Sequence, residues 1–227
     1  MTKVLITDPI DQSGIDILSQ VAQVDQKIGI SESELASIIH EYDALMIRSG
    51  TQVTEQIINS SKNLRIIGRA GVGVDNVDVK AATQKGVLVV NSPGGNTIAA
   101  AEHTIAMMLA LSRNIPIANS SMFKGKWERK KFVGNELFKK KLGVVGLGKI
   151  GTHVAKVANA LGMEVLGYDP FVSNERAQQL QVKLSELDIL FQESDYVTLH
   201  LPRTVETENL VDIKVLKSMK NTSKLIN

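Results

Sequence analysis

The sequence predicts an α/β fold made of two doubly wound parallel sheets, each in its own domain. Short apolar runs alternate with helix-like stretches along the chain, which is typical of strand–helix–strand units and therefore of parallel sheets. Pro93, Gly94 and Gly95 interrupt this alternation near the middle of the chain. We therefore expect a first domain over residues 1–96 and a second over residues 97–227.

The first domain is expected to contain five strands. Ser31 and Glu34 have the spacing of a capping box, and Thr54 can cap the apolar run through Ile57 and Ile58. The resulting β-α-β-α order predicts a parallel sheet with helices on both faces. The strand-like runs, each apolar and bounded by turn-forming residues, cover residues 4–7, 21–25, 44–48, 64–68 and 87–91.

A long apolar stretch opens the second domain. Residues 97–111 are so uniformly apolar that we expect a helix buried on several sides. A basic stretch, residues 124–141, then leads into the next strand. Because a parallel strand normally leads into another element, a strand-like run over 224–227 predicts a domain that is incomplete at its carboxyl end. The other expected strands cover 143–146, 164–169 and 196–200, and the helices cover 152–161, 185–193 and 212–219.

Bulk composition narrows the class of protein. A formal net charge of +2 argues against a dedicated nucleic-acid binder, and the lack of cysteine excludes disulfides and thiolate metal sites. No apolar run approaches the roughly 20 residues of a membrane span, and no signal-peptide layout is visible, so we expect a cytoplasmic protein that binds neither nucleic acid nor membranes. No histidine has metal-ligand spacing, so no metal is expected, and His103 should be buried in the apolar helix.

A glycine-rich turn, G-x-G-x-x-G, spans residues 146–151 between a strand-like and a helix-like run. In dinucleotide-binding units the first glycine permits the tight turn, the second lets the backbone approach a pyrophosphate, and the third lets helix pack closely on strand. Asp169 follows Gly151 by 18 residues, at the end of the next predicted strand, where it can accept hydrogen bonds from the adenosine ribose. Its charge would repel a 2′-phosphate, so we expect NAD rather than NADP. A strand–turn–helix without a ligand is the less favoured alternative.

Six segments carry a more specific signal. They are RSGT at 48–51, RAGVGVDNVD at 69–78, NSPGGNT at 91–97, AAEH at 100–103, WERKKF at 127–132 and GLGKIG at 146–151. Together and in this order they resemble the D-isomer-specific 2-hydroxyacid dehydrogenases, and among these the phosphoglycerate dehydrogenase branch. The resemblance covers residues 4–227. It implies a flavodoxin-like substrate domain, a Rossmann NAD domain and a homodimer or homotetramer.

Anion-binding groups follow two of the predicted strands, at the edge where α/β proteins gather ligands. Gly71 and Gly73 leave backbone N–H groups uncovered and suited to a carboxylate, and Arg48 and Arg69 can hold anionic oxygens in bidentate fashion. The resemblance implies that the Gly-x-Gly backbone binds the substrate carboxylate while both arginines approach a phosphate. The alternative is that each arginine is a surface ion-pair partner. The expected substrate residues are Arg48, Ser49, Arg69, Gly71, Val72, Gly73 and Arg129.

Further contacts are implied by the resemblance. Arg129, beside Trp127, would reach a neighbouring subunit's active site, although its basic neighbours favour a solvated linker surface. The turn that follows the strand over 196–200 would contact the nicotinamide-ribose side of the cofactor, and Leu201 stands where many relatives carry a small hydroxyl residue. The expected cofactor residues are Val72, Asn96, Thr97, Gly146, Gly148, Lys149, Ile150, Gly151, Tyr168, Asp169, His200, Leu201, Pro202 and Thr207.

The resemblance implies NAD-dependent oxidation of 3-phosphoglycerate to 3-phosphohydroxypyruvate, in L-serine biosynthesis. Such chemistry needs an arginine that polarises the C2 oxygen and a histidine, tuned by a carboxylate, that takes its proton. In the family these residues follow the strand matched by residues 224–227, so all three are expected beyond residue 227. Reduction of glyoxylate or hydroxypyruvate is the nearest alternative, and a non-catalytic, NAD-sensing corepressor is a more distant one.

We predict that residues 1–227 alone show no turnover, because the acid–base pair is expected outside them. The purified fragment, supplied with NAD and 3-phosphoglycerate, should produce no NADH above a buffer control. Measurable NADH formation would contradict this prediction.

Overall fold

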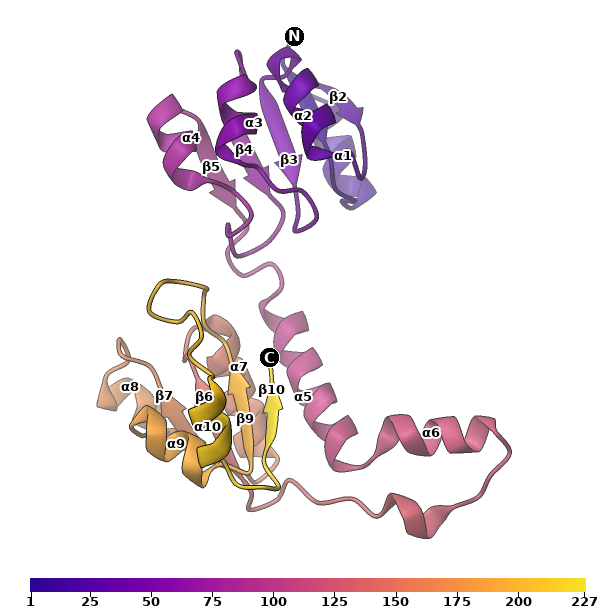
Figure 1. The fold of residues 1–227 in the computed structure, drawn as a ribbon, viewed down its shortest axis with the longest axis vertical. Coiled ribbons are helices and arrows are strands. Elements are labelled where there is room, and N and C mark those ends of the chain that lie inside the picture. The colour runs from indigo at the N-terminus through magenta and orange to yellow at the C-terminus, as the bar shows by residue number, and fades with distance from the viewer. The chain divides into compact units, whose positions relative to one another are not determined.

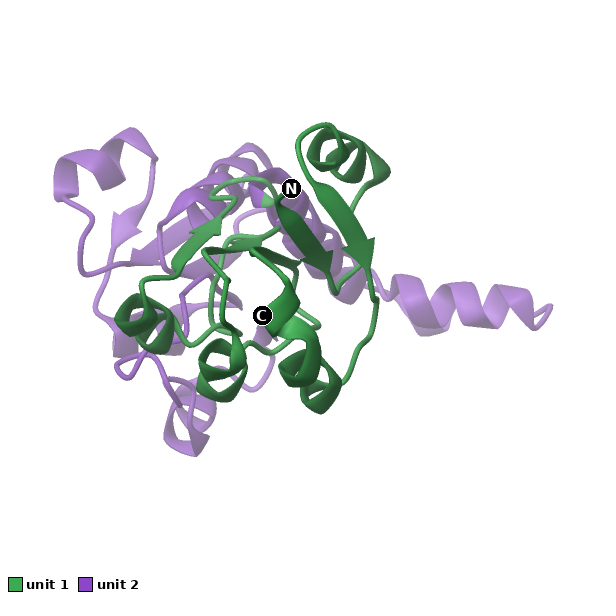
Figure 2. Ribbon diagram, turned by 90° about the horizontal axis from the view of Figure 1, so that it is seen from above, with its two compact units in different colours: residues 1–96 green, residues 97–227 purple.

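The chain divides into two compact units. The computed structural model describes residues 1–227, with unit 1 formed by Met1–Asn96 and unit 2 by Thr97–Asn227 (Figure 2). Each unit has its own parallel sheet and its own buried core. None of the helices combines the length and the apolar character that crossing a membrane requires.

Unit 1 is built on a five-stranded sheet in which all neighbouring strands are parallel. The order is β2-β1-β3-β4-β5, which is the flavodoxin-like order. Helix α1 covers one face of the sheet, and α2, α3 and α4 cover the other (Figure 1). The elements are β1 Lys3–Ile6, α1 Gln12–Ser19, β2 Gln23–Gln26, α2 Glu32–Ile38, a 3-10 turn Ile39–Glu41, β3 Ala44–Ile47, α3 Glu55–Ser60, β4 Ile66–Arg69, α4 Val79–Lys85 and β5 Leu88–Asn91.

The core of unit 1 lies between the sheet and the face covered by three helices. Leu5, Ile47 and Ile67 from the strands join one hydrophobic cluster with Leu35 of α2 and Ile57 of α3. Each of these side chains is at most 1% exposed, and burying one such side chain stabilises a fold by roughly 1.5–3 kcal/mol. This packing fixes the strands and leaves the loops at their carboxyl ends available for a site.

The two helix caps predicted for unit 1 have different outcomes. Ser31 forms the predicted capping box, in which its hydroxyl accepts from the Glu34 N–H and its own N–H donates to the Glu34 carboxylate. Thr54 precedes α3 but makes no capping bond, so that prediction was wrong. Its hydroxyl instead donates to Glu32 Oε1 at 2.6 Å. The hydroxyl thus bonds a charged acceptor on the neighbouring helix, and charge-assisted hydrogen bonds of this kind are among the stronger ones.

Unit 2 contains a second parallel sheet, ordered β10-β9-β6-β7-β8. Helices α5 and α7 pack together, and Leu142 and Val144 of β6 are buried in the hydrophobic cluster on their side of the sheet. Helices α9 and α10 contact each other, and Phe191 of α9 joins Val145 of β6 in a second hydrophobic cluster. Both units therefore have the predicted doubly wound α/β architecture. The elements are α5 Thr97–Ser112, α6 Ile115–Phe123, a 3-10 turn Arg129–Phe132, β6 Lys141–Val145, α7 Lys149–Ala160, β7 Glu164–Tyr168, α8 Asn174–Gln179, β8 Lys183–Leu184, α9 Leu187–Glu193, β9 Tyr196–Leu199, α10 Ile213–Ser218 and β10 Lys224–Ile226.

Helix α5 is buried along one side within unit 2. Ala101 and Ile105 are buried, whereas Ile98 and Leu111 are 51% and 45% exposed. The expected burial on several sides is therefore not met inside this unit. His103 is exposed, so the prediction that it is buried was wrong. At 3.6 residues per turn it points away from the side that carries Ala101 and Ile105.

An arm formed by residues 113–140 follows α5 and contains α6 and the 3-10 turn Arg129–Phe132 (Figure 1). No helix was predicted at α6 or at α8, and no strand was predicted at β8. Asn114 adopts a left-handed conformation, φ 56°, and separates α5 from α6. Ile117, Phe123 and Trp127 are 56%, 85% and 76% exposed. The apolar side chains of α6 have no core to face within unit 2. The helix therefore lacks the amphipathic pattern by which a helix is predicted from a sequence.

Candidate functional site

The glycine-rich turn of unit 2 joins β6 to α7, and its three glycines have different surroundings. Gly146 has φ +92°, and a Cβ there would lie 2.5 Å from the carbonyl oxygen of His200. A Cβ on Gly151 would collide with the carbonyl oxygen of Gly146, so α7 can approach β6 this closely only with glycine at that position. Gly148, in contrast, faces open space, with nothing within 4 Å of its virtual Cβ. The turn is thus tightly packed at Gly146 and Gly151, whereas its backbone is open to solvent at Gly148.

Helix α7 begins directly at this open backbone. Its N-cap is Gly148, and no side chain caps the helix. Thr152, which the sequence analysis did not single out, donates its hydroxyl to the Leu147 carbonyl at 2.8 Å and so closes the turn from within the first helical turn. The first N–H groups of a helix lack intrahelical partners and carry a partial positive charge. An anion in front of Gly148 would therefore meet hydrogen-bond donors and a favourable potential.

Asp169 stands directly after β7, beside the same turn. Its Oδ2 accepts from the Leu147 N–H at 2.8 Å, and its Oδ1 accepts from the Phe171 N–H at 2.9 Å. A carboxylate offers about four acceptor positions, so each oxygen keeps capacity for a further donor such as a ribose hydroxyl. Tyr168, the last residue of β7, is half-buried. Asp169 thus anchors the glycine-rich turn, which its position in the sequence did not reveal.

The end of β9 forms the wall beside Gly146. The His200 N–H donates to the Val145 carbonyl at 2.8 Å, and His200 Nε2 lies 3.0 Å from Thr198 Oγ1. Burial lowers the pKa of His200 to about 4, so its ring is neutral at pH 7. Leu201 Cδ2 lies 2.9 Å from the virtual Cβ of Gly146. This segment therefore supplies an uncharged surface next to the glycine-rich turn.

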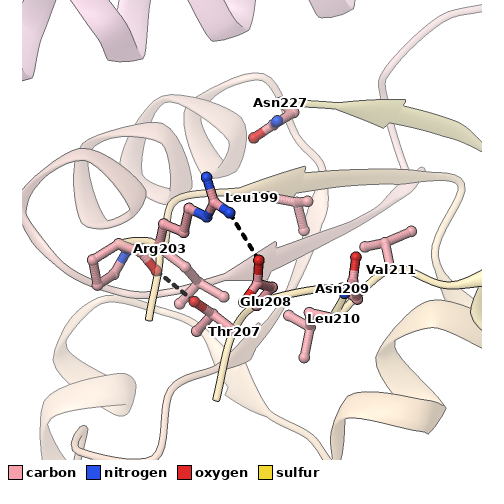
Figure 3. Close-up of a pocket in the computed structure, with 10 residues that line it drawn as sticks. Leu199, Arg203, Thr207, Glu208, Asn209, Leu210, Val211 and Asn227 are labelled. Carbon is pink, nitrogen blue, oxygen red and sulfur yellow. Dashed lines mark hydrogen bonds and ion pairs between the residues drawn. The ribbon is translucent and has the colours of Figure 1, made fainter. Parts of the chain in front are cut away.

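A pocket of about 400 Å³ lies beyond the carboxyl ends of β9 and β10 (Figure 3). Arg203 pairs with Glu208 at 2.8 Å, and Thr207 donates its hydroxyl to the Pro202 carbonyl at 2.6 Å, which holds the loop in a compact form. Three predicted cofactor residues, Leu201, Pro202 and Thr207, line this pocket. The rest of its lining was not predicted and consists of Leu199, Arg203, Glu208, Asn209, Leu210, Val211 and Asn227.

Unit 1 has a pocket of about 390 Å³ at the carboxyl edge of its sheet. It brings together residues that follow four different strands: Asp11 after β1, Arg48 after β3, Gly71 after β4 and Asn96 after β5. This is the edge of a doubly wound sheet where ligands bind. Ile10, Ala70, Ser92 and Gly95 complete the lining. Neither these four residues nor Asp11 were among the expected substrate or cofactor residues.

Both predicted anion-binding arginines belong to this edge of unit 1. Arg48 is exposed and donates from Nη1 to the Pro9 carbonyl at 3.3 Å. Arg69 donates from Nε to Asn76 Oδ1 at 2.9 Å, and its Nη1 lies where a Cβ of Gly71 would be. Neither takes part in the ion pairs of the structure, which join Lys131 to Glu128, Lys141 to Glu193, Arg203 to Glu208 and Lys220 to Asp195. Within residues 1–227, no carboxylate therefore forms an ion pair with Arg48 or Arg69.

The remaining predicted residues are distributed over both units. Ser49, Val72 and Gly73 are exposed loop residues of unit 1 that do not line its pocket. Thr97 opens α5, and Lys149 and Ile150 lie in the first turn of α7. Arg129 lines a separate pocket of about 230 Å³ in the arm, together with Trp127 and Phe132. Of the predicted cofactor residues, Val72 and Asn96 belong to unit 1 and the others to unit 2.

Comparison with known proteins adds a family and a set of relatives. Residues 105–227 match the family described as D-isomer specific 2-hydroxyacid dehydrogenase, NAD binding domain. A D-3-phosphoglycerate dehydrogenase from Synechocystis is 62% identical over 227 residues, which are 100% of this chain and 41% of that protein. The D-3-phosphoglycerate dehydrogenase of Archaeoglobus fulgidus is 51% identical over 99% of this chain and 43% of its own length. The chain thus spans about two fifths of the length of these curated relatives.

Solved structures resemble this chain over nearly its whole length. The D-lactate dehydrogenase of Aquifex aeolicus, complexed with NAD and lactic acid, has a TM-score of 0.88 at 27% identity over 100% of this chain and 68% of that one. The NAD⁺-bound 3-phosphoglycerate dehydrogenase of Entamoeba histolytica has a TM-score of 0.82 at 28% identity, covering 99% of this chain and 70% of that one.

The glycine-rich turn yields a paired prediction. Gly148→Ala places a methyl group in open space, so the fold should keep its thermal stability while affinity for a dinucleotide falls about tenfold or more, because the backbone no longer approaches the pyrophosphate. Gly151→Ala should instead destabilise unit 2 by about 1–3 kcal/mol, since its Cβ meets the Gly146 carbonyl. Thermal unfolding and titration calorimetry with NAD distinguish the two variants. Equal stability loss in both would contradict the assigned roles.

Proposed function

The chain belongs to the D-isomer-specific 2-hydroxyacid dehydrogenases, and from this membership we propose that the full-length protein is an NAD-dependent D-3-phosphoglycerate dehydrogenase of L-serine biosynthesis. The observation that carries the proposal is the pair Arg48 and Arg69, which stand at the carboxyl edge of unit 1 without carboxylate partners. A substrate with a carboxylate alone would need one anion site, whereas 3-phosphoglycerate needs two.

Unit 2 would hold the cofactor. We assign the pyrophosphate to the backbone in front of Gly148 and to the first turn of α7, including Lys149 and Ile150. Asp169 would accept the adenosine ribose hydroxyls, and its charge favours NAD over NADP. The uncharged wall formed by His200, Leu201 and Pro202 would face the nicotinamide-ribose side. NAD supplies the acceptor for the hydride that leaves C2 of the substrate.

Unit 1 would hold the substrate. The backbone N–H groups of the loop from Gly71 to Gly73 suit the carboxylate, and Val72 contributes through its backbone. Arg48 and Arg69 would bind the phosphate, since a guanidinium matches phosphate oxygens in bidentate fashion. Ser49 lies in the same turn as Arg48 and would contribute its hydroxyl. The curated relatives are more than twice as long as this chain, and we assign the acid–base residues of the reaction to sequence outside residues 1–227.

The arm supports a further part of the proposal. Its exposed apolar side chains, among them Phe123 and Trp127, form the kind of surface that a second subunit covers. We propose a cytoplasmic homodimer or homotetramer in which Arg129 contributes to the neighbouring subunit's site. A 2-hydroxy acid without a phosphate would not require such a cationic contribution, whereas a phosphorylated 2-hydroxy acid would.

Replacing Arg69 tests the substrate. In the full-length protein, Arg69→Gln should raise KM for 3-phosphoglycerate about 10- to 100-fold, because a charge-assisted hydrogen bond contributes roughly 1.5–3 kcal/mol. The KM for hydroxypyruvate, which has no phosphate, should change far less. Steady-state kinetics with both substrates measure the difference.

Arg65→Gln is the matched control, because Arg65 is an exposed residue that precedes the opposite, amino end of β4. It should leave both KM values unchanged. Equal losses for the two substrates in Arg69→Gln would favour a glyoxylate or hydroxypyruvate reductase instead.

A further inference from the structure

Asn76, in the loop between β4 and α4, is a buried side chain to which the sequence analysis gave no role. It is 4% exposed, and its carboxamide makes three hydrogen bonds to other segments. Nδ2 donates to the Arg48 carbonyl at 2.7 Å and to the Thr51 carbonyl at 2.6 Å. Oδ1 accepts from Arg69 Nε at 2.9 Å. Because carbonyls only accept and a guanidinium only donates, one orientation of the amide satisfies all three partners.

The turn over residues 48–51 is held from a second direction by Asp8, which follows β1. Asp8 Oδ2 accepts from the Arg48 N–H at 2.6 Å and from the Thr51 N–H at 3.1 Å. Asp8 therefore accepts hydrogen bonds from the backbone N–H groups of Arg48 and Thr51, and Asn76 donates hydrogen bonds to the backbone carbonyls of the same two residues. Asp8 is 6% exposed. The backbone that carries Arg48 is consequently fixed on both sides by buried side chains.

Arg69 is oriented by the same amide. With Nε bound to Asn76 Oδ1, the guanidinium keeps its two terminal amino groups for other partners. Nη1 lies against the backbone of Gly71, one of the residues that line the unit 1 pocket. The amide thus contacts both the backbone of one anion-binding arginine and the side chain of the other.

We propose that Asn76 is a positioning residue for the phosphate of the substrate, because it couples Arg48 to Arg69 in a single hydrogen-bonded unit. The proposal rests on the proposed function, in which these two arginines bind that phosphate. Asn76 itself touches neither substrate nor cofactor. Its removal releases the turn over 48–51 and lets the Arg69 guanidinium rotate, so the phosphate end of the substrate loses its fixed partners while the carboxylate end keeps the backbone of Gly71 and Gly73.

The test uses the full-length protein with Asn76→Ala and Asn76→Asp. Asn76→Ala removes all three hydrogen bonds. Asn76→Asp retains the shape of the side chain and an acceptor for Arg69, but it places an oxygen opposite two carbonyls, so it remains informative if the alanine variant does not fold. Both should raise KM for 3-phosphoglycerate about tenfold, with the KM for hydroxypyruvate changed less than about twofold. A purely structural residue would impair the two substrates equally, and that result would overturn the proposal.

Two further measurements sharpen the test. In a double-mutant cycle the combination of Asn76→Ala with Arg69→Gln should raise KM for 3-phosphoglycerate by less than the product of the two single effects, because part of the amide's effect is exerted through Arg69. Additive losses would contradict coupling. Asn63→Ala is the matched control, since Asn63 is an exposed asparagine whose amide also bonds a distant carbonyl, that of His40 at 3.2 Å. It should leave both KM values unchanged.

Failure of the proposed function is recognised separately. If the wild-type full-length protein does not turn over 3-phosphoglycerate, the assignment of substrate is wrong, and binding of inorganic phosphate decides the role of Asn76. The rise in melting temperature with phosphate should then be smaller for Asn76→Asp than for Asn63→Ala. Equal rises would overturn the positioning role.

Discussion

A backbone contact within the glycine-rich turn sets the geometry on which the cofactor site depends. The carbonyl of Gly146 occupies the place of a Cβ on Gly151, so α7 begins closer to β6 than any other residue at 151 would allow. That closeness brings the amino end of α7 to the carboxyl edge of the sheet, between β7 and β9, where the strand order reverses. Asp169 then ties the turn to the end of β7. The backbone donors and the carboxylate that we assign to the cofactor are therefore parts of one rigid piece.

Both units fix their strand ends with carboxylates that accept backbone N–H groups from a neighbouring strand. Asp43, just before β3, accepts from the Lys3 N–H of β1 at 2.8 Å. Asp195, just before β9, accepts from the Lys141 N–H of β6 at 2.9 Å. These are corresponding places, because each aspartate precedes the strand that follows the reversal of strand order in its sheet. The N–H groups at the ends of paired parallel strands have no partner on the neighbouring strand. The carboxylates of Asp43 and Asp195 satisfy such N–H groups and so hold the ends of β1 and β6 in place.

Features set by neighbouring residues could be predicted from the sequence, and features set by distant ones could not. Nine of the ten strands, the doubly wound class and the capping box at Ser31 follow from local periodicity and short spacings, whereas the two-residue strand β8 was not predicted. Asn76 bonds a carbonyl 28 residues away, and Thr54 bonds a carboxylate 22 residues away, so their partners depend on strand register and loop path. Arg48 could be named from its position after a strand, but the pair of buried side chains that hold its backbone could not. Helix α6 was not predicted, because it packs on no core in unit 2 and its sequence therefore shows no apolar stripe at helical spacing.

The small size of the proposed substrate gives a physical reason for fixing the backbone of Arg48 through Asp8 and Asn76. A molecule with few atoms offers little surface to bury, so its affinity depends on a few charged contacts and on how little ordering those contacts require. An arginine on a free loop would require several residues to be ordered on binding, at about 1–2 kcal/mol for each backbone. With the backbone of Arg48 and Thr51 already bonded to Asp8 and Asn76, only the arginine side chain remains to be ordered, at about 0.5–1.5 kcal/mol. In the proposed function, the buried polar side chains of this edge would thus let the exposed Arg48 bind a small anion without the cost of folding a loop around it.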